Sequence, residues 1–282
     1  SWMSCDDCQR RIRDEGLKDE HELQSYFISR VEKIINAKGK KMIGWDEILE
    51  GGLAPNASVM SWRGEAGGIK SAKSGHDVVM SPNTHCYLDL KQGDPEIEPD
   101  LGYGQLFLNT VYSYNPVPPD LSPEHAEHIL GVQGNLWGES MQTVSQLNYM
   151  LFPRMFAMAE VAWSPQEKRN FDAFIPRMEH ALERLDVMGV NYARSAYNVS
   201  VQPSLNPTSS NLSIALSTEV KNVEIRYTLD GSEPDINSFL YTDPFKLKGA
   251  ATIRAISFKD GQVYGKETVK TINTDKAAGN KE

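Results

Sequence analysis

Three tryptophans occupy equivalent places in the sequence, each at the end of a short apolar run. Trp45, Trp62 and Trp137 follow such runs and lie close to a carboxylate or an arginine. Flat indole rings cover the apolar faces of a pyranose, and carboxylates accept hydrogen bonds from its hydroxyls. Asp89 and Glu139 are suitable acceptors. The pattern therefore predicts a shared sugar-binding pocket, and the alternative is that the rings only pack in the core.

The adjacent carboxylates Asp46 and Glu47 are a candidate acid–base pair of a glycosidase. Neighbouring residues on a strand point to opposite faces, so both could face one substrate only if the strand ends before them. We therefore favour a structural role, in which one of them forms hydrogen bonds beneath the pocket. A third reading keeps Glu47 or Glu139 as the acid of a different barrel glycosidase.

The cysteines allow a weak metal hypothesis. Cys5 and Cys8 have the CxxC spacing of a zinc half-site, and His85 and Cys86 would have to supply the other half. The alternatives are a local disulfide or two free thiols. The histidines have no HExxH spacing, and the serines have no GxSxG elbow. We expect neither a metal nor a cofactor.

Up to about Tyr197, short apolar runs alternate with helical periods. This alternation indicates parallel strands joined by crossover helices, with the polar and aromatic residues at the carboxyl ends of the strands. A (β/α)8 barrel and an open doubly wound sheet both bind ligands at that edge. The expected strands lie at 42–44, 58–61, 77–81 and 129–134, and the expected helices at 21–38, 67–74, 145–163 and from Phe171 to a stop at Gly189.

After Tyr197 the composition changes to Ser, Thr, Asn and Pro with β-branched alternation. Residues 198–210 read as the entry to a second region, and 223–228 and 252–258 alternate like strands. Asp-Gly pairs at 230–231 and 260–261 are hairpin signals. We expect a partial catalytic domain at 1–197, a small immunoglobulin- or fibronectin-like sandwich at 198–274 and a disordered tail at 275–282. The sandwich could bind sugar, but we favour a buttress or spacer.

Composition excludes several classes of function. The 282 residues carry 29 basic and 38 acidic side chains, a net charge of −9. An acidic chain without a basic block is a poor candidate for binding nucleic acid. No apolar stretch is long enough for a membrane span, and no signal-peptide pattern is present.

Four segments, taken together and in order, carry a family resemblance. They resemble β-N-acetylhexosaminidases of glycoside hydrolase family 20. The resemblance implies that residues up to about Ala193 form the second half of a (β/α)8 catalytic barrel, followed by a small β domain. The four segments are Gly44-Trp45-Asp46-Glu47-Ile48, Ser61-Trp62-Arg63-Gly64, Cys86-Tyr87-Leu88-Asp89 and Gly131-Val132-Gln133-Gly134-Asn135-Leu136-Trp137-Gly138-Glu139.

The resemblance also implies a reaction and roles for individual residues. Such enzymes remove terminal β-linked N-acetylglucosamine or N-acetylgalactosamine by substrate-assisted retaining hydrolysis through an oxazolinium intermediate, which departs from the two-carboxylate rule. Tyr87 would position the acetamido oxygen for attack. The acetamido pocket would be walled by Trp45, Trp62 and Trp137, and ring hydroxyls would be held by Asp89 and Glu139.

One family feature is missing from the sequence. The family's acetamido-orienting Asp and general-acid Glu lie in a His-x-Gly-Gly-Asp-Glu motif, which these 282 residues do not contain. We therefore expect a chain that begins just after the catalytic pair, is inactive alone, and dimerises or associates with a missing barrel half. The resemblance implies a secreted, periplasmic or cell-surface bacterial protein. The alternative is a non-catalytic carbohydrate-binding protein.

Overall fold

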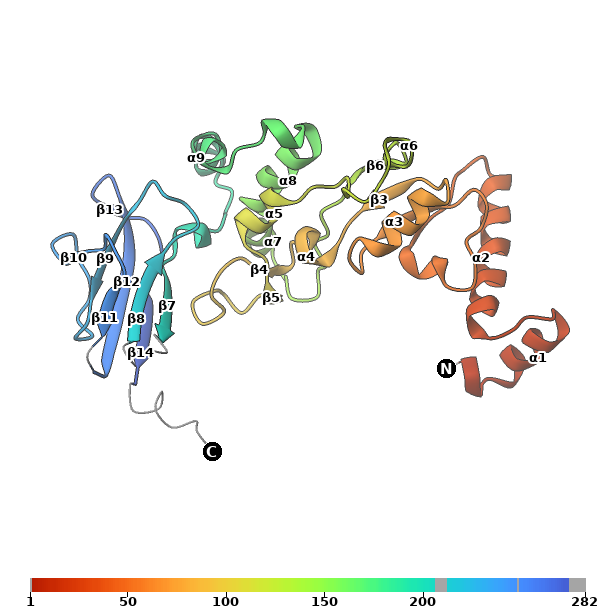
Figure 1. Ribbon diagram of the computed structural model, residues 1–282. Coiled ribbons are helices and arrows are strands. Elements are labelled where there is room, and N and C mark those ends of the chain that lie inside the picture. Colours follow the sequence, from red (N-terminus) through yellow and green to blue (C-terminus); the bar gives the residue numbers. More distant parts are fainter. Residues whose placement is uncertain (1, 206–211, 248, 274–282) are drawn as a thin grey trace. The chain divides into compact units, whose positions relative to one another are not determined.

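The computed structural model describes residues 2–205, 212–247 and 249–273 (Figure 1). The chain divides into two compact units. Unit 1 comprises residues 1–87, 114–135 and 158–166, and unit 2 comprises residues 88–113, 136–157 and 167–282. The predicted disordered tail at 275–282 lies outside the described residues.

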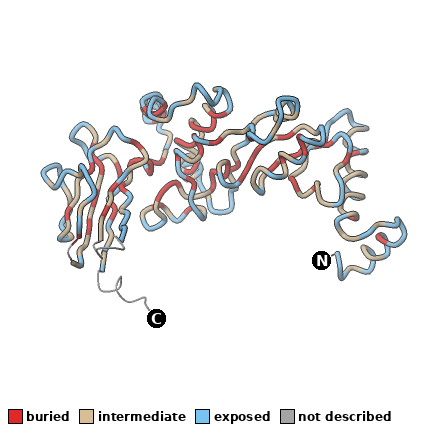
Figure 2. The backbone as a smooth tube through the Cα atoms, in the orientation of Figure 1, coloured by how far each residue is buried: buried red, intermediate tan, exposed pale blue. Residues whose placement is uncertain are grey.

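Unit 1 is built on a parallel sheet. Its strands are β1 (Ile43–Trp45), β2 (Ser58–Ser61), β3 (Val78–Met80) and β6 (Ile129–Val132), in the order β1-β2-β3-β6. All three pairings are parallel, as the alternation predicts. The two inner strands are the most buried, with Val59, Val78 and Met80 at 0 % exposure, and buried positions run along them in Figure 2. Parallel strands buried in this way need both faces covered.

Helices precede and link these strands. The longest, α2, starts where Asp19 accepts hydrogen bonds from the backbone N–H groups of His21 and Glu22, an N-cap that satisfies two donors of the first turn. Its apolar face packs on a buried cluster that includes Met42 and Val59. The helical segments of unit 1, α2 included, are η1 (Trp2–Ser4), α1 (Asp6–Asp14), α2 (Glu20–Ala37), η2 (Asp46–Leu49), α3 (Ala66–Lys73), α4 (Asn83–Cys86) and α6 (Pro123–Ala126).

Unit 2 begins with short elements and continues into three helices. The single helix predicted over 145–163 is wrong: Pro153 lacks an N–H group, Phe152 before it is extended, and two helices result. The helix from Phe171 ends as predicted, because Gly189 adopts the left-handed conformation at φ 67°. The elements are β4 (Leu90–Lys91), β5 (Tyr103–Gln105), α5 (Leu108–Ser113), α7 (Val144–Leu151), α8 (Arg154–Trp163, entering unit 1 at Met158), η3 (Gln166–Lys168), α9 (Phe171–Met188) and η4 (Ser195–Tyr197).

The remainder of unit 2 consists of strands in two antiparallel sheets. One has the order β11-β8-β7, and the other has the order β10-β9-β12-β13 with β14 also paired to β12. Ile214, Leu216, Ile225 and Ile253 share one hydrophobic cluster, so both sheets contribute to the same core. The strands are β7 (Ser200–Leu205), β8 (Leu212–Ser217), β9 (Glu224–Thr228), β10 (Phe239–Leu240), β11 (Phe245–Leu247), β12 (Ala251–Lys259), β13 (Gln262–Val263) and β14 (Thr268–Ile272).

The two Asp-Gly signals have different outcomes. Asp260 and Gly261 join β12 to β13 with φ angles of 51° and 75°, as the predicted two-residue hairpin requires. Asp230 and Gly231 form no such hairpin, since β9 pairs with β10 only after a longer loop. Asp230 instead accepts a hydrogen bond from the backbone N–H of Ser232, and a local Asx turn forms.

Candidate functional site

A cavity of about 530 Å³ in unit 2 contains three of the predicted sugar-binding residues. We call it the Asp89 cavity, after its buried carboxylate. Trp137 is 41 % exposed and Glu139 is exposed, so both present their side chains to solvent at this place. The cavity is lined by Asp89, Gly102, Tyr103, Trp137, Glu139, Ser140 and Met141.

Asp89 is the unusual group in this cavity. The residue is 3 % exposed, and its Oδ1 has no hydrogen-bond partner among the described residues. Burial raises the pKa of its carboxyl group, and the Tyr103 hydroxyl and the Arg154 charge only partly counteract this effect. A buried acceptor without a partner is costly unless a ligand or water supplies a donor. Asp89 is therefore suited to accept a hydrogen bond from a sugar hydroxyl.

The backbone around Asp89 is held by a buried arginine. Arg154, at 0 % exposure, donates hydrogen bonds to the carbonyl oxygens of Leu88, Met150 and Leu106 at 2.6, 2.7 and 2.9 Å. Burial lowers its pKa to about 9, and the guanidinium stays charged at neutral pH. Gly102 comes so close that an added Cβ would lie 1.9 Å from the Asp89 carbonyl oxygen.

In unit 1, the carboxylates that follow β1 are engaged by the protein itself. Asp46 is 2 % exposed, and its Oδ2 accepts the backbone N–H groups of Trp62 and Arg63 at 3.0 and 3.1 Å. Both oxygens of Glu47 lie 3.0 Å from the indole Nε1 of Trp62. The strand does end at Trp45, and the two carboxylates hold the segment after β2 in place. These contacts favour the structural role over the acid–base pair.

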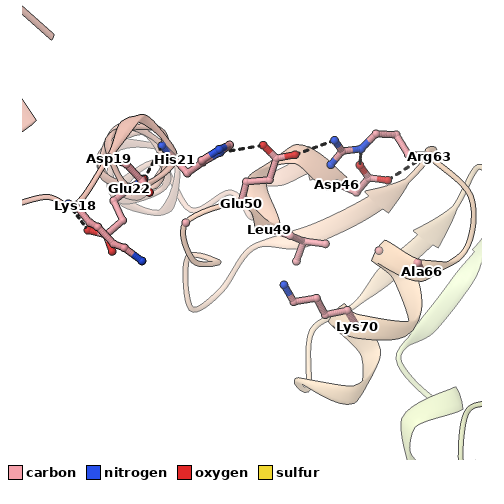
Figure 3. A pocket seen from close by; sticks show the side chains of 12 residues that line it. Lys18, Asp19, His21, Glu22, Asp46, Leu49, Glu50, Arg63, Ala66 and Lys70 are labelled. Carbon is pink, nitrogen blue, oxygen red and sulfur yellow. Dashed lines mark hydrogen bonds and ion pairs between the residues drawn. The ribbon is translucent and has the colours of Figure 1, made fainter. Parts of the chain in front are cut away.

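A chain of ion pairs extends from Asp46 across a second cavity, of about 640 Å³ (Figure 3). Arg63 Nε donates to Asp46 Oδ1 at 2.5 Å and Nη1 donates to Glu50 Oε1 at 2.8 Å, and His21 Nδ1 lies 3.2 Å from Glu50 Oε2. The Arg63 guanidinium lowers the pKa of Glu50. The charges of this cavity therefore largely compensate one another.

Tyr87 and Trp62 come together in unit 1. Their ring centroids lie 6.2 Å apart with an interplanar angle of 25°, and Tyr87 is 6 % exposed. Tyr87 also forms a parallel bridge with Asn135, whose side-chain N–H donates to the Ser81 hydroxyl at 2.7 Å. The segments that follow β3 and β6 are thereby tied together. Trp45 is half-buried at the end of β1.

The zinc hypothesis is wrong for the described residues. No group of three or more His, Cys, Asp or Glu side chains in the described parts of the chain lies close enough to hold a metal ion. Cys5 and Cys8 are free thiols, and the Cys5 sulfur accepts the backbone N–H of Cys8 at the start of α1. Cys86 is buried.

Two residues of this region were missed in the sequence. Tyr103 lines the Asp89 cavity, and its only signal is an aromatic residue between Gly102 and Gly104. Arg154 is a lone cation in an otherwise apolar stretch, which indicates a buried and functional charge.

Within the described ranges, no helix has both the length and the apolar character to cross a membrane.

Comparison with known proteins identifies the two regions. Residues 1–166 match the glycosyl hydrolase family 20 catalytic domain, and residues 214–273 match the Fn3 associated domain. A beta-hexosaminidase of Porphyromonas gingivalis is 44 % identical over 266 residues, which cover 91 % of this chain and 33 % of the relative. A beta-N-acetylhexosaminidase of Cellulomonas fimi is 33 % identical, covering 60 % and 34 %. The chain thus spans about a third of the length of these curated relatives.

Solved structures agree with this relationship. An exo beta-N-acetylglucosaminidase of Vibrio harveyi, solved with N-acetylglucosamine, superposes with a TM-score of 0.61 at 33 % identity and covers 68 % of this chain and 30 % of its own. A beta-N-acetylhexosaminidase of Bacteroides fragilis superposes with a TM-score of 0.59 at 27 % identity, covering 68 % and 40 %. The parallel sheet and its helices fit part of a (β/α)8 barrel.

Proposed function

The chain belongs to glycosyl hydrolase family 20, and we propose that it supplies the sugar-binding side of an exo-acting β-N-acetylhexosaminidase. The substrates are glycans that end in β-linked N-acetylglucosamine or N-acetylgalactosamine. Residues 1–197 would form the second half of the catalytic (β/α)8 barrel, and the strands after Asn198 a fibronectin-like sandwich. The protein would act outside the cytoplasm, where such glycans are exposed.

One observation carries this proposal: the unpartnered Oδ1 of Asp89, buried in a cavity beside an exposed indole and an exposed carboxylate. Trp137 supplies an apolar face for a sugar ring, and Asp89 and Glu139 accept hydrogen bonds from its hydroxyls. A cavity of about 530 Å³ lies within the range of about 300–1,000 Å³ typical of small-molecule sites.

The reaction would be substrate-assisted. The carbonyl oxygen of the 2-acetamido group attacks the anomeric carbon, the glycosidic C–O bond breaks, and the leaving oxygen takes a proton from a general acid. Water then adds to the anomeric carbon of the oxazolinium and gives a proton to the conjugate base of the general acid, while the bond between that carbon and the acetamido oxygen breaks and the acetamido group is restored. Tyr87 would donate a hydrogen bond to the acetamido oxygen, and Trp45 and Trp62 of the same unit would wall that group.

None of the residues given a role above is the general acid. The 282 residues contain no His-x-Gly-Gly-Asp-Glu motif, so we propose that this polypeptide binds the sugar and does not cleave it alone. On a chromogenic N-acetyl-β-glucosaminide we expect no turnover above buffer. Turnover comparable to that of the Porphyromonas relative would contradict this part of the proposal.

Sugar binding is tested by titrating the 282-residue polypeptide with N-acetylglucosamine in a calorimeter. Asp89→Asn replaces one acceptor oxygen of the carboxyl group with an amide donor and should weaken binding about tenfold. Asp243→Asn is the matched control, since Asp243 is an exposed carboxylate of the β region. Absence of binding, or equal binding by both variants, would contradict the assigned site.

A further inference from the structure

A separate cavity of unit 2 has the chemistry of a second binding site. It encloses about 330 Å³ and shares no lining residue with the Asp89 cavity. Its walls come from α7, from the end of α9 and the segment after it, and from the turn that leads to β14. We call it the Arg194 cavity, and it is lined by Tyr149, Asp186, Asn191, Tyr192, Arg194, Ser195, Asn198, Tyr264, Gly265 and Lys266.

Its walls are aromatic and are held in place by the protein. The guanidinium carbon of Arg194 lies over the rings of Tyr264 and Tyr192, 4.9 and 5.6 Å from their centroids. The Tyr264 ring packs edge-on against buried Tyr197, with centroids 4.5 Å apart. Half-buried rings of this kind give a sugar ring or another flat, partly apolar group a surface to pack on.

The cationic groups of this cavity keep most of their donors for a ligand. Arg194 has five N–H donors, and within the described residues its side chain makes one hydrogen bond, to the Tyr192 hydroxyl at 3.2 Å. Lys266 Nζ has three and donates to the Ile97 carbonyl at 3.3 Å. An arginine stacked on a ring still presents its planar edge, which matches the two oxygens of a carboxylate.

The side chains that line the cavity carry more positive than negative charge, and the buried Glu98 next to them accepts the hydroxyls of Tyr149 and Ser195. Two cations, Arg194 and Lys266, face one carboxylate, Asp186, and one oxygen of that carboxylate already accepts the Tyr192 hydroxyl at 3.0 Å. Lys259 also lies over the Tyr264 ring but is paired with Glu179.

From the tyrosine rings and the unused donors of Arg194 and Lys266, we propose that the Arg194 cavity binds a sugar residue that carries a carboxylate or a sulfate. The anion pairs with the guanidinium and ammonium groups, and the sugar ring packs on Tyr264. The proposal does not depend on the hydrolase site, because the two cavities share no residue. It gives the β region a part in glycan binding, whereas the sequence favours a buttress.

Titration of the 282-residue polypeptide with three sugars of matched size tests the proposal. Glucuronic acid and glucose 6-sulfate carry the two anions, and glucose carries none; all three lack the acetamido group. We expect at least one anionic sugar to bind about tenfold more tightly than glucose and to weaken as salt is raised. Equal affinities for all three sugars, or binding of none, would overturn the proposal.

Variants assign the binding to the cavity. Arg194→Ala should reduce the affinity for the anionic sugar about tenfold, and Arg194→Lys, which keeps the charge and loses the planar edge, should reduce it less. Arg184→Ala, at an exposed arginine elsewhere on α9, should leave it unchanged. A folded Arg194→Ala protein, checked by circular dichroism, that binds like the parent refutes the assignment.

Discussion

The two units differ in their least satisfied carboxylates, although Glu98 of unit 2, which accepts a hydroxyl on each oxygen, resembles those of unit 1. In unit 1, Asp46 accepts three N–H groups and Glu32 accepts the backbone N–H of Asn56. In unit 2, Asp89 and Glu219 each keep one buried oxygen without a partner among the described residues. Asp89 is as buried as Asp46 and Glu32, whereas Glu219 is half-buried. Of these four carboxylates, Asp89 and Glu219 are the two that have acceptor capacity left on a buried oxygen.

The difference separates positioning from binding. A carboxylate whose lone pairs are filled by backbone and arginine donors stabilises a loop and has little to offer a ligand. A buried carboxylate with a free oxygen destabilises the fold until a donor arrives. In the sequence, the adjacent Asp46 and Glu47 look more like functional residues than the lone Asp89. The contacts favour a structural role for Asp46 and Glu47 and a binding role for Asp89.

The largest expected effect is at Arg154, which holds the backbone next to Asp89. Arg154→Met leaves three buried carbonyl oxygens without their donor and should lower the free energy of unfolding by more than about 3 kcal/mol. Urea unfolding followed by circular dichroism measures the change. Arg184→Met, at an exposed arginine on α9, should cost under about 0.5 kcal/mol. Similar losses in both would mean that the buried contacts contribute little.

Asp46 should be the most sensitive carboxylate. Asp46→Ala removes the acceptor of the Trp62 and Arg63 backbone N–H groups and the partner of the Arg63 guanidinium. We expect the free energy of unfolding to fall by about 2–3 kcal/mol in urea titrations. Asp120→Ala, at an exposed carboxylate of the same unit, is the control and should be nearly neutral. A neutral Asp46→Ala would remove the distinction between the two units.

Glu219 predicts a pH dependence of stability. It accepts the backbone N–H of Asn109 at 2.8 Å, and burial raises its pKa to about 7, above an ordinary value near 4.5. Between these two values the folded state binds a proton that the unfolded state does not, so stability should fall as pH rises from 4.5 through 7.

The Glu219→Gln variant isolates this group, since glutamine mimics the protonated form. At pH 8 the variant should be more stable than the parent by roughly 3 kcal/mol, and at pH 4.5 the two should be nearly equal. Thermal unfolding across this pH range measures the difference. A constant difference at every pH would exclude the titration of Glu219 as its cause.

The smallest expected effect on stability is at Asp89. Because burial already raises the pKa of this carboxyl group, the neutral, isosteric Asp89→Asn should change the free energy of unfolding by less than about 1 kcal/mol. The matched substitution Asp46→Asn loses the charge paired with Arg63 and should cost more. Equal urea midpoints for these two variants would contradict the comparison.

Local patterns predicted much of the fold because they depend on neighbours in the chain. The four parallel strands follow from short apolar runs, and the ends of α2 and α9 follow from a capping Asp19 and from Gly189. The break at Pro153 was also readable, since proline cannot continue a helix, but the long apolar pattern hid it. The Asp230-Gly231 pair misled for the opposite reason: a turn signal states that the chain bends, not which strand it returns to.

The sequence by itself determined which segments form the parallel strands, which aromatic and acidic residues stand at the strand ends, and the family. Whether the oxygens of an acidic side chain have hydrogen-bond donors was decided only by the tertiary structure, because those donors come from residues distant in the sequence. Asp46 accepts hydrogen bonds from residues 16 and 17 positions away. The backbone next to Asp89 is held by Arg154. Hydrogen-bond saturation is a property of three-dimensional neighbours, and no spacing along the chain encodes it.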